Sequence, residues 1–123
     1  MHKREEDGLV VVDQSICIGC RTCEMRCPYG APQFDFQKKL MSKCDGCYER
    51  VSQGLMPICV DSCPQRALDF GEMNTLREKY GNGDQVAPLP DPFLTFPNLI
   101  VKAHADARPQ GDTTGAIQNP DEV

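Results

Sequence analysis

The sequence predicts a small α+β protein in which short strands and helices surround two groups of cysteines, followed by an extended C-terminal tail. Three observations lead to this fold class. The cysteines fall into two groups, within residues 17–28 and 44–64, and each group is followed by a short strand-like run. The apolar runs are short, so a core built from them is modest. From residue 81 onward there is no cysteine and proline becomes frequent.

Composition limits the partners that the chain can have. The chain has 123 residues and a formal net charge of −5, so a nucleic-acid backbone is not expected as a ligand. No apolar run approaches the roughly 18 residues of a membrane span, and no charged-then-apolar signal segment opens the chain. Any contact with a membrane is therefore expected to go through a partner protein.

The first half predicts a strand, a cysteine-bearing loop and a second strand. Residues 9–12, LVVV, form a short apolar run that favours a strand. The cysteine loop ends at a Cys-Pro pair, residues 27–28, because proline ends any helix that carries the last cysteine. Residues 33–36, QFDF, alternate polar and aromatic side chains as a second strand does, and Lys38 and Lys39 predict a turn after it.

The second half resembles the first with a longer insertion, so the two halves form a weak internal repeat. Both have a CxxC pair, a later CxxxCP and a trailing strand-like segment, which in the second half is ALDF, residues 67–70. The insert, residues 48–58, predicts a helical turn ended by Gly54 and a further helix with Pro57 at its first position. Residues 73–80 predict a short helix closed by the glycine that follows. The repeat implies pseudo-twofold pairing of the halves.

The remaining chain, residues 81–123, is predicted to be an extended, proline-rich tail that docks on another subunit. It holds six of the ten prolines, and only NLIV, residues 98–101, is compatible with a strand. Loops this long are uncommon inside compact domains, so we expect a domain at residues 1–80 and a separate tail. A mobile terminus is the alternative, but the apolar residues of the tail favour docking: Leu89, Phe93, Leu94, Phe96 and Ile100.

The cysteines predict a metal site, because thiols at this density either form disulfides or bind soft metals. They are Cys17, Cys20, Cys23, Cys27, Cys44, Cys47, Cys59 and Cys63. The first group has the spacing C-x2-C-x2-C-x3-C-P, which is typical of proteins that bind 4Fe-4S clusters and whose fourth cysteine ligates another cluster. Gly19 and Gly46 lie between paired cysteines, where backbone N–H groups must approach the cluster sulfides. We therefore predict a ferredoxin-like fold that binds two 4Fe-4S clusters.

Two other interpretations fit the cysteine spacing less well. In a zinc-stabilised interaction domain, Cys17, Cys20, Cys44 and Cys47 would form one tetrahedral site and the other cysteines a second. Against zinc stand Cys23, which extends a three-ligand loop, and the two Cys-Pro pairs. Disulfides are disfavoured because nothing marks the chain as secreted.

The eight cysteines of this chain are enough to supply four ligands to each of two clusters. One cluster would take Cys17, Cys20 and Cys23 with Cys63, and the other would take Cys44, Cys47 and Cys59 with Cys27. Cysteines that cross between two motifs are the rule in two-cluster ferredoxins. The residues alone therefore suggest a self-contained two-cluster ferredoxin.

No catalytic residue is predicted. His2 and His104 lie far in sequence from the cysteines, no nucleophile stands beside a plausible base, and no glycine-rich phosphate loop is present. The expected chemistry is one-electron transfer by the cofactor. The basic residues near the cysteines either offset cluster charge or form a solvated face; they are Arg21, Arg26, Lys43 and Arg66.

Four segments carry a resemblance to a known family: VVVDQSICIGCRTCEMRCPYGAPQF, KCDGCYERV, PICVDSCPQRALDFG and VAPLPDPFLTFPNLIVKAHADARPQGDTTG. Together they closely resemble the iron-sulfur B subunit of the bacterial dimethyl sulfoxide reductase family, over essentially the whole chain. Subunits of this family carry four cysteine groups and four 4Fe-4S clusters, and this sequence matches the third and fourth groups. The resemblance implies a truncated B subunit, in which Met1 is an internal methionine taken as a start or the beginning of a fragment.

The resemblance also implies a different ligand wiring. Cys17, Cys20 and Cys23 would hold a cluster completed by the absent second group, and Cys27 would serve that group's own cluster. In the same way, Cys44, Cys47 and Cys59 would hold a cluster completed by the absent first group, and Cys63 would serve the cluster of that group. We prefer this family wiring to the internal pairing, because the long insert before Cys59 and the tail belong to a four-cluster protein.

The function implied by the resemblance is electron transfer in anaerobic respiration. The B subunit would relay electrons from a membrane quinol-oxidising anchor to a molybdopterin catalytic subunit, and would not itself be the enzyme. It would lie peripherally at the bacterial inner membrane within the complex, with export alongside its catalytic partner left open. The terminal acceptor is open among dimethyl sulfoxide, other S- or N-oxides and selenate-like oxyanions. A non-functional remnant of a split gene is the remaining alternative.

Overall fold

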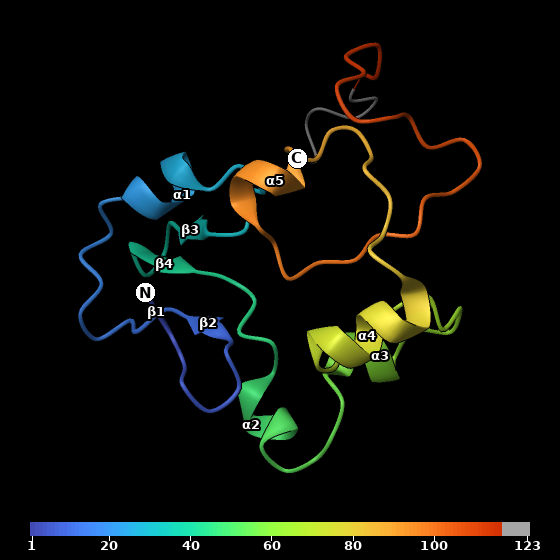
Figure 1. The fold of residues 1–123 in the computed structure, drawn as a ribbon. Coiled ribbons are helices and arrows are strands. Elements are labelled where there is room, and N and C mark those ends of the chain that lie inside the picture. The colour runs from blue at the N-terminus through green and yellow to red at the C-terminus, as the bar shows by residue number, and fades with distance from the viewer. Residues whose placement is uncertain (117–123) are drawn as a thin grey trace. The chain divides into compact units, whose positions relative to one another are not determined.

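The computed structural model describes residues 1–116 and divides the polypeptide into two compact units (Figure 1). The first unit, Met1–Phe70, contains all eight cysteines, and the second unit is Gly71–Val123. Short strands and short helices make up the described elements, as the α+β class predicts. The helix α4, Met73–Tyr80, groups with the second unit, whereas the domain boundary expected from the sequence lies after this helix.

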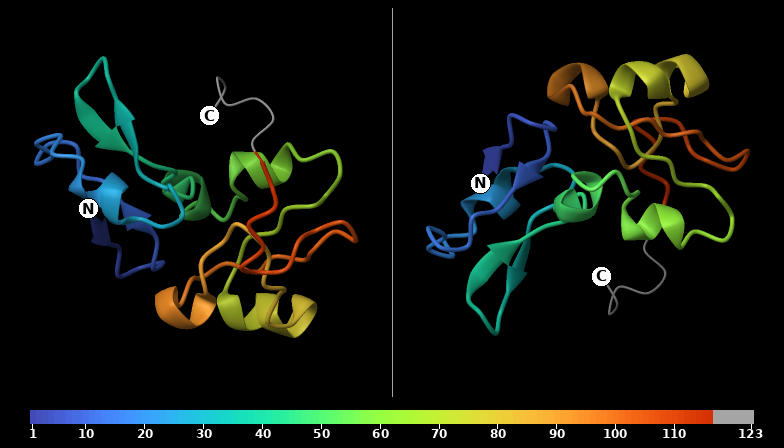
Figure 2. Two further views of the ribbon diagram at one scale, coloured as in Figure 1. Left: turned by 90° about the horizontal axis from the view of Figure 1, so that it is seen from above. Right: turned by 90° about the horizontal axis from the view of Figure 1, so that it is seen from below.

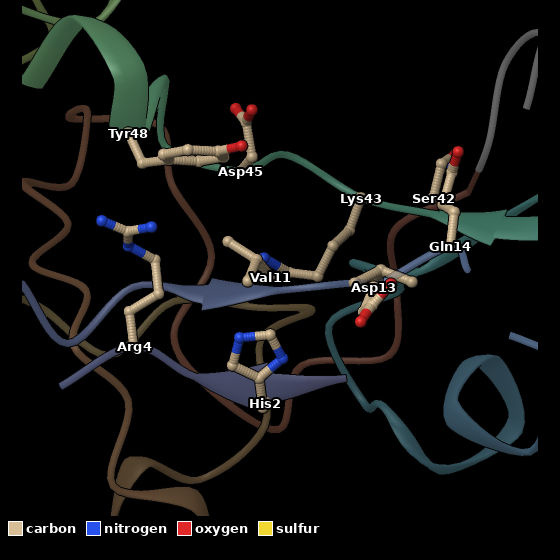
Figure 3. A pocket seen from close by; sticks show the side chains of 10 residues that line it. His2, Arg4, Val11, Asp13, Gln14, Ser42, Lys43, Asp45 and Tyr48 are labelled. Carbon is tan, nitrogen blue, oxygen red and sulfur yellow. The ribbon is translucent and has the colours of Figure 1, made fainter. Parts of the chain in front are cut away.

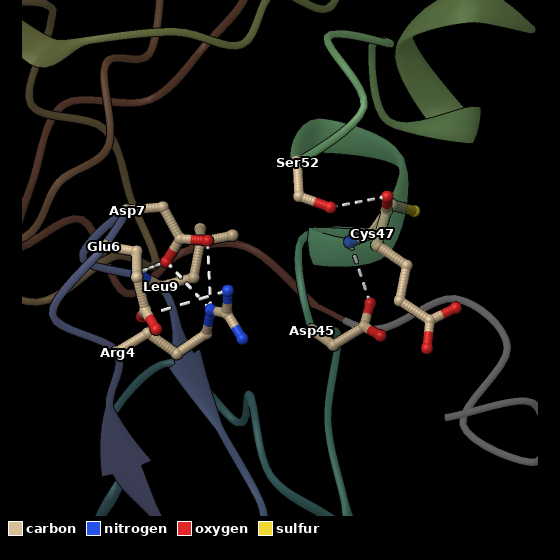
Figure 4. Close-up of polar contacts among 8 residues, drawn as sticks. Arg4, Glu6, Asp7, Leu9, Asp45, Cys47 and Ser52 are labelled. Carbon is tan, nitrogen blue, oxygen red and sulfur yellow. Dashed lines mark hydrogen bonds and ion pairs between the residues drawn. The ribbon is translucent and has the colours of Figure 1, made fainter.

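The N-terminal residues form a hairpin of two very short strands. β1, His2–Lys3, pairs antiparallel with β2, Val10–Val11. Between them the Asp7 carboxylate accepts hydrogen bonds from Arg4 Nε at 3.0 Å and from the Leu9 backbone N–H at 3.0 Å (Figure 4). β2 lies inside the predicted strand, but β1 was not predicted because its polar residues carry no strand pattern.

A second hairpin follows the first cysteine group and projects from the unit in both views of Figure 2. β3, Gln33–Asp35, pairs antiparallel with β4, Leu40–Ser42, with Phe34 opposite Met41. The Asp35 carboxylate closes the turn by accepting hydrogen bonds from the backbone N–H groups of the two residues that follow Phe36. The turn itself was predicted, but its return strand was not.

Three short helices carry cysteines or follow them directly. α1, Thr22–Arg26, follows Cys20, while α2, Tyr48–Val51, and α3, Ile58–Asp61, occupy the insert and its end. The turn after α2 reaches Gly54 at a φ of 76°, a left-handed conformation that glycine adopts without strain. Pro57 caps α3 instead of opening it, because its ψ of 145° is extended and outside the helical range.

The core is very small. Among the described residues only Pro32, Met41 and Pro57 are buried, and Met41 is 2% exposed. Large apolar side chains elsewhere stay in solvent, including Ile18 at 86% exposure and Phe36 at 75%. Such limited apolar burial cannot offset the conformational entropy that folding costs, so the first unit needs additional stabilisation.

The second unit folds back on itself, whereas the sequence predicts an extended tail. The Asp84 backbone N–H donates to the Val101 carbonyl at 2.8 Å, and the Asp84 carboxylate accepts from the Ala103 N–H at 2.8 Å. An isolated antiparallel bridge joins Val86 and Pro109. The backbone loops back because these polar groups find partners across the loop. The second unit also contains a helix that was not predicted, α5, Pro92–Thr95, whose N-terminus is capped by the Asp91 carboxylate.

The helix predicted at residues 73–80 is confirmed, whereas two predicted strands are wrong. Helix α4 has the predicted bounds, and Gly81 ends it at a φ of 74°. Residues 67–70 and 98–101 are not strands. In the first of these segments, the Phe70 backbone N–H donates to the Asp69 carboxylate at 2.9 Å instead of to a neighbouring strand. In the second, Val101 makes its contact with Asp84 as an isolated interaction.

Candidate metal centre

All eight cysteines are free thiols in the first unit. Cys20, Cys44 and Cys59 are exposed and the other five are half-buried. Among residues 1–116, no three histidine, cysteine, aspartate or glutamate side chains converge into a group that could hold a metal ion. The assignment of individual cysteines to clusters therefore stays a prediction, and what the structure describes is the backbone and side chains around each sulfur.

The first cysteine loop lies directly against the β3–β4 turn. Gly19, at a φ of 68°, approaches this turn so closely that a Cβ at its position would lie 2.3 Å from the Lys39 carbonyl oxygen. No real Cβ tolerates that distance to backbone, so the position requires glycine. The hairpin therefore fixes the path of the backbone from Cys17 to Cys20.

Arg21 fastens the other side of this loop, although its residue type gives no hint of it. It adopts a φ of 59° immediately before α1. Its guanidinium lies 5.0 Å from the centre of the Phe34 ring and 5.8 Å from that of Phe36, a cation–π geometry. Its Nε donates to Glu24 at 2.7 Å, and this hydrogen bond lowers the pKa of the Glu24 carboxyl. The loop, α1 and the hairpin are thus joined through one side chain.

Hydrogen-bond donors are directed at several cysteine sulfurs. The backbone N–H of Met41 donates to Cys17 Sγ at 3.4 Å. Because the Met41 side chain is also one of the few buried among the described residues, the small core and the first ligand position are coupled through one residue. The hydroxyl of Thr22, followed by its backbone N–H, lowers the pKa of the Cys20 thiol. Donors of this kind favour the thiolate, which is the form that binds metal.

The backbone that follows Cys63 lowers the pKa of its thiol. The N–H of Ala67 makes the largest contribution to lowering the pKa of the Cys63 thiol, with smaller contributions from the three other N–H groups of residues 65–68. Arg66 takes a φ of 51°, which turns the backbone at this point. Sequence reasoning missed this effect on the thiol because it read residues 67–70 as a strand.

The second cysteine loop uses the N-terminal hairpin as its support. A Cβ at Gly46, whose φ is 71°, would lie 2.9 Å from both Cδ atoms of Leu9. The Asp45 carboxylate accepts from the Cys47 N–H at 2.8 Å (Figure 4). The Gly46 N–H donates to Cys44 Sγ at 3.5 Å. The Lys43 ammonium donates to the carbonyls of Val10 and Cys44, so it ties the loop to β2.

A cleft of about 540 Å³ lies beside this second loop (Figure 3). Its walls come from both strands of the first hairpin and from residues 42–48, and they include His2, Arg4 and Tyr48. The Arg4 guanidinium stacks over the Tyr48 ring at 4.5 Å. No cysteine belongs to the lining, so this cleft is separate from the predicted ligands.

The donor set fits iron-sulfur clusters on two observations. The candidate ligands are eight thiols without disulfides, which suits soft, thiolate-bound metal. Both C-x-G-C loops turn at a glycine with positive φ, and N–H groups are directed at cysteine sulfurs in both groups. Such N–H groups are the outer-shell partners that tune thiolate-bound clusters. The fold and the site therefore define a small iron-sulfur protein.

Comparison with protein families makes the assignment specific. Residues 1–73, more than half of the chain, match the family of the 4Fe-4S dicluster domain, and this protein belongs to that family. Its eight cysteines fit two 4Fe-4S clusters, so the predicted cofactors are confirmed.

The chain is also similar to several reductase subunits. The B subunit of anaerobic dimethyl sulfoxide reductase of Escherichia coli (strain K12) is 60% identical over 123 residues, which is all of this chain and 60% of that protein. The probable anaerobic dimethyl sulfoxide reductase subunit YnfG of the same strain is 59% identical over the same coverage. Selenate reductase subunit beta of Thauera selenatis is 54% identical over 71 residues, 58% of this chain and 22% of that protein.

These comparisons confirm the resemblance that the cysteine motifs and the tail indicate. The chain spans about 60% of the length of the two dimethyl sulfoxide reductase subunits that it matches. Among residues 1–116, no helix has the length and apolar character that crossing a membrane requires.

Proposed function

We propose that this chain is an electron-transfer iron-sulfur subunit of a molybdopterin reductase complex and is not the catalytic subunit. The observation that carries the proposal is the pair of C-x-G-C loops, each with its glycine at positive φ, in a member of the dicluster family. The similar proteins are named as B or beta subunits of reductases, which supports a place beside a larger catalytic subunit.

The chain's own residues would bind the clusters and adjust their electronic properties. Bound 4Fe-4S clusters carry single electrons, at potentials that span roughly −700 to +450 mV among proteins. We assign Cys17, Cys20 and Cys23 to one cluster and Cys44, Cys47 and Cys59 to the other. The N–H donors around these sulfurs stabilise negative charge on thiolate, which favours the reduced state.

Cys27 and Cys63 would supply ligands that cross between clusters. We propose that they serve clusters whose other ligands lie outside this chain, as the family resemblance implies, and not the two clusters held here. The alternative is the internal crossing, with Cys63 on the first cluster and Cys27 on the second. The lowered pKa of the Cys63 thiol, to which the Ala67 N–H contributes most, is compatible with either assignment, because it favours the thiolate whichever cluster receives it.

The electron donor would be a quinol-oxidising membrane anchor, and the acceptor a molybdopterin subunit that chooses among S-oxides, N-oxides and selenate-like oxyanions. We propose that residues 81–123 dock on one of these subunits. In support, Phe93, Leu94 and Phe96 around α5 are 72%, 79% and 80% exposed, and aromatic and leucine side chains at such exposure favour burial against a partner. The complex would place this chain peripherally at the bacterial inner membrane.

The central experiment is anaerobic reconstitution of the full chain with iron and sulfide. We expect visible charge-transfer absorption, iron and acid-labile sulfide in equal amounts, paramagnetic signals after reduction, and oxidation of the reduced protein by its molybdopterin subunit. A matched variant with Cys17, Cys20 and Cys23 replaced by serine should lose one set of signals. A protein that binds zinc without sulfide, or that does not pass electrons to the reductase, contradicts the proposal.

Docking of the second unit is tested separately. Replacing Phe93, Leu94 and Phe96 together by serine should leave the absorption of the clusters unchanged and weaken co-purification with the catalytic or anchor subunit by about tenfold or more. Deletion of residues 81–123 should do the same. Loss of the cluster absorption on deletion would show instead that this segment belongs to the cluster domain.

A further inference from the structure

The insert between Cys47 and Cys59 has little apolar packing to hold it. No residue of α2 or α3 is buried, and Leu55, Met56 and Ile58 are 48%, 45% and 57% exposed. Pro57 is the one buried residue of this segment. Yet the segment has to bring Cys59 back to the same cluster as Cys44 and Cys47, so something other than a core must set its path.

Arg50 makes the side-chain contacts that span this insert. Its Nη2 donates to the Asp61 carboxylate of α3 at 2.6 Å, and its Nε donates to the Met56 carbonyl at 3.0 Å. Its own backbone carbonyl accepts from the Leu55 N–H at 3.0 Å. One residue of α2 therefore binds the backbone just before Pro57 and a side chain beyond it, within α3.

The geometry of these contacts matters more than their strength. The Arg50 and Asp61 side chains are 35% and 51% exposed, and ion pairs that water reaches contribute little to stability. The planar guanidinium, however, donates in fixed directions, so satisfying two acceptors at once restricts the position of each. Asp61 lies two residues beyond Cys59 on the same short helix, so restraining Asp61 restrains the direction of the Cys59 side chain.

We propose that Arg50 is a positioning residue for the second cysteine group, which holds the α3 helix and its Cys59 in register with the Cys44–Cys47 loop. This inference rests on the proposed function, because it takes these cysteines as the ligands of one cluster. It goes beyond that function by naming a residue, not itself a ligand, on which the integrity of one cluster and not the other depends.

The test compares variants of the reconstituted full chain: Arg50→Ala, Asp61→Ala, the double variant and the charge reversal Arg50→Asp with Asp61→Arg. The matched control is Arg108→Ala, which removes another arginine–aspartate pair, with Asp112, from the second unit. Measurements are iron and sulfide content, the reduced-state paramagnetic spectrum and the reduction potential of each cluster.

We expect Arg50→Ala to lose roughly half of the iron or to shift the signal and potential of one cluster while sparing the other. Asp61→Ala should have a weaker effect of the same kind, because the contact with Met56 remains. The double variant should be no worse than Arg50→Ala, and the charge reversal should restore part of the loss. Arg108→Ala should match the wild-type protein.

Wild-type signals from both clusters in Arg50→Ala, or equal loss of both, would overturn the inference. A wild-type protein that takes up no iron would instead overturn the proposed function. Amide hydrogen exchange of the reconstituted protein at residues 58–61 gives a second readout of the positioning claim: we expect about fivefold faster exchange in Arg50→Ala, with residues 22–26 unchanged. Unchanged exchange at residues 58–61 would refute it.

Discussion

The two cysteine groups hold their cysteine loops in place by different contacts. In the first group three cysteines lie within residues 17–23, and backbone contact holds the loop: Gly19 sits against the Lys39 carbonyl, and Arg21 stacks on Phe34. In the second group the third cysteine comes only after the insert, and an exposed pair between Arg50 and Asp61 spans the gap. The first loop is shaped by the backbone of a hairpin. The second rests its Cys44–Cys47 turn on the Leu9 side chain, and side chains of its own insert span the gap to Cys59.

This difference predicts how ordered each cysteine group is before it binds metal. A hairpin has its own hydrogen-bond ladder, so the first loop inherits a defined path from secondary structure. An ion pair that water reaches is weak, so the second loop depends more on the metal to draw its parts together. We therefore expect the second group to be the less ordered of the two in the iron-free protein.

The largest expected effect comes from removing the clusters altogether. With three buried side chains among its described residues, the first unit should lose cooperative folding on chelation or acidification. Far-UV circular dichroism and thermal melting report the loss, and hydrogen exchange should show residues 44–61 losing protection before residues 17–42. An iron-free protein with native-like spectra and a cooperative melt contradicts this prediction.

The next effect concerns iron content and separates the two ligand wirings. Under the wiring proposed here, Cys27→Ser and Cys63→Ser each keep the iron of the wild-type protein, because neither thiolate serves a cluster in this chain. Under internal pairing each variant loses roughly four of about eight irons, Cys27→Ser from the second group and Cys63→Ser from the first. Iron quantification with sulfide analysis decides between them, and a loss in both variants would establish a self-contained two-cluster ferredoxin.

The two loop glycines give a direct comparison of backbone and side-chain support. Both have positive φ, but the Cβ of Gly19→Ala would meet a backbone carbonyl at 2.3 Å, whereas that of Gly46→Ala would meet the movable Leu9 side chain at 2.9 Å. We expect Gly19→Ala to lower the free energy of unfolding by roughly 2–4 kcal/mol and Gly46→Ala by roughly 1–2 kcal/mol. Chemical denaturation of the cluster-loaded variants measures both. Equal losses in the free energy of unfolding would mean that the Lys39 backbone moves aside as easily as the Leu9 side chain.

The smallest effect should come from Arg21. Arg21→Leu keeps an apolar contact with Phe34 but loses the cation–π interaction, so we expect a fall of a few degrees in the melting temperature and no change in iron content. Glu24→Gln is the matched control, because it removes the ion pair and leaves the stacking in place. If Glu24→Gln has the larger effect, the ion pair and not the ring contact fastens the first loop.

The sequence allowed prediction of the features that have local signals. The predicted cysteine ligands follow from their spacing, the strand at β3 from alternation, and the turn after it and the helix closed by Gly81 from turn residues. The class of cofactor followed in the same way, and membership of the dicluster family confirms it.

What could not be predicted depends on partners distant in sequence. The contact of Arg21 with Phe34 and the span of Arg50 to Asp61 join residues whose types alone name no partner. Residues 67–70 look like a strand, but the structure gives them no strand partner. Sequence reasoning did not single out Arg50, the residue that orders the insert after Cys47, because an arginine in a short polar helix usually points into solvent.

The small core also has a consequence for the cell. Ile16, Ile18, Met25 and Phe36 stay exposed around the first cysteine group even in the folded protein, and a polypeptide without metal would expose still more. Such a polypeptide is a ready substrate for chaperones and proteases as soon as it leaves the ribosome. Its abundance should therefore follow the supply of iron and sulfide more closely than its rate of synthesis, so that iron starvation depletes the subunit even where its messenger RNA is plentiful.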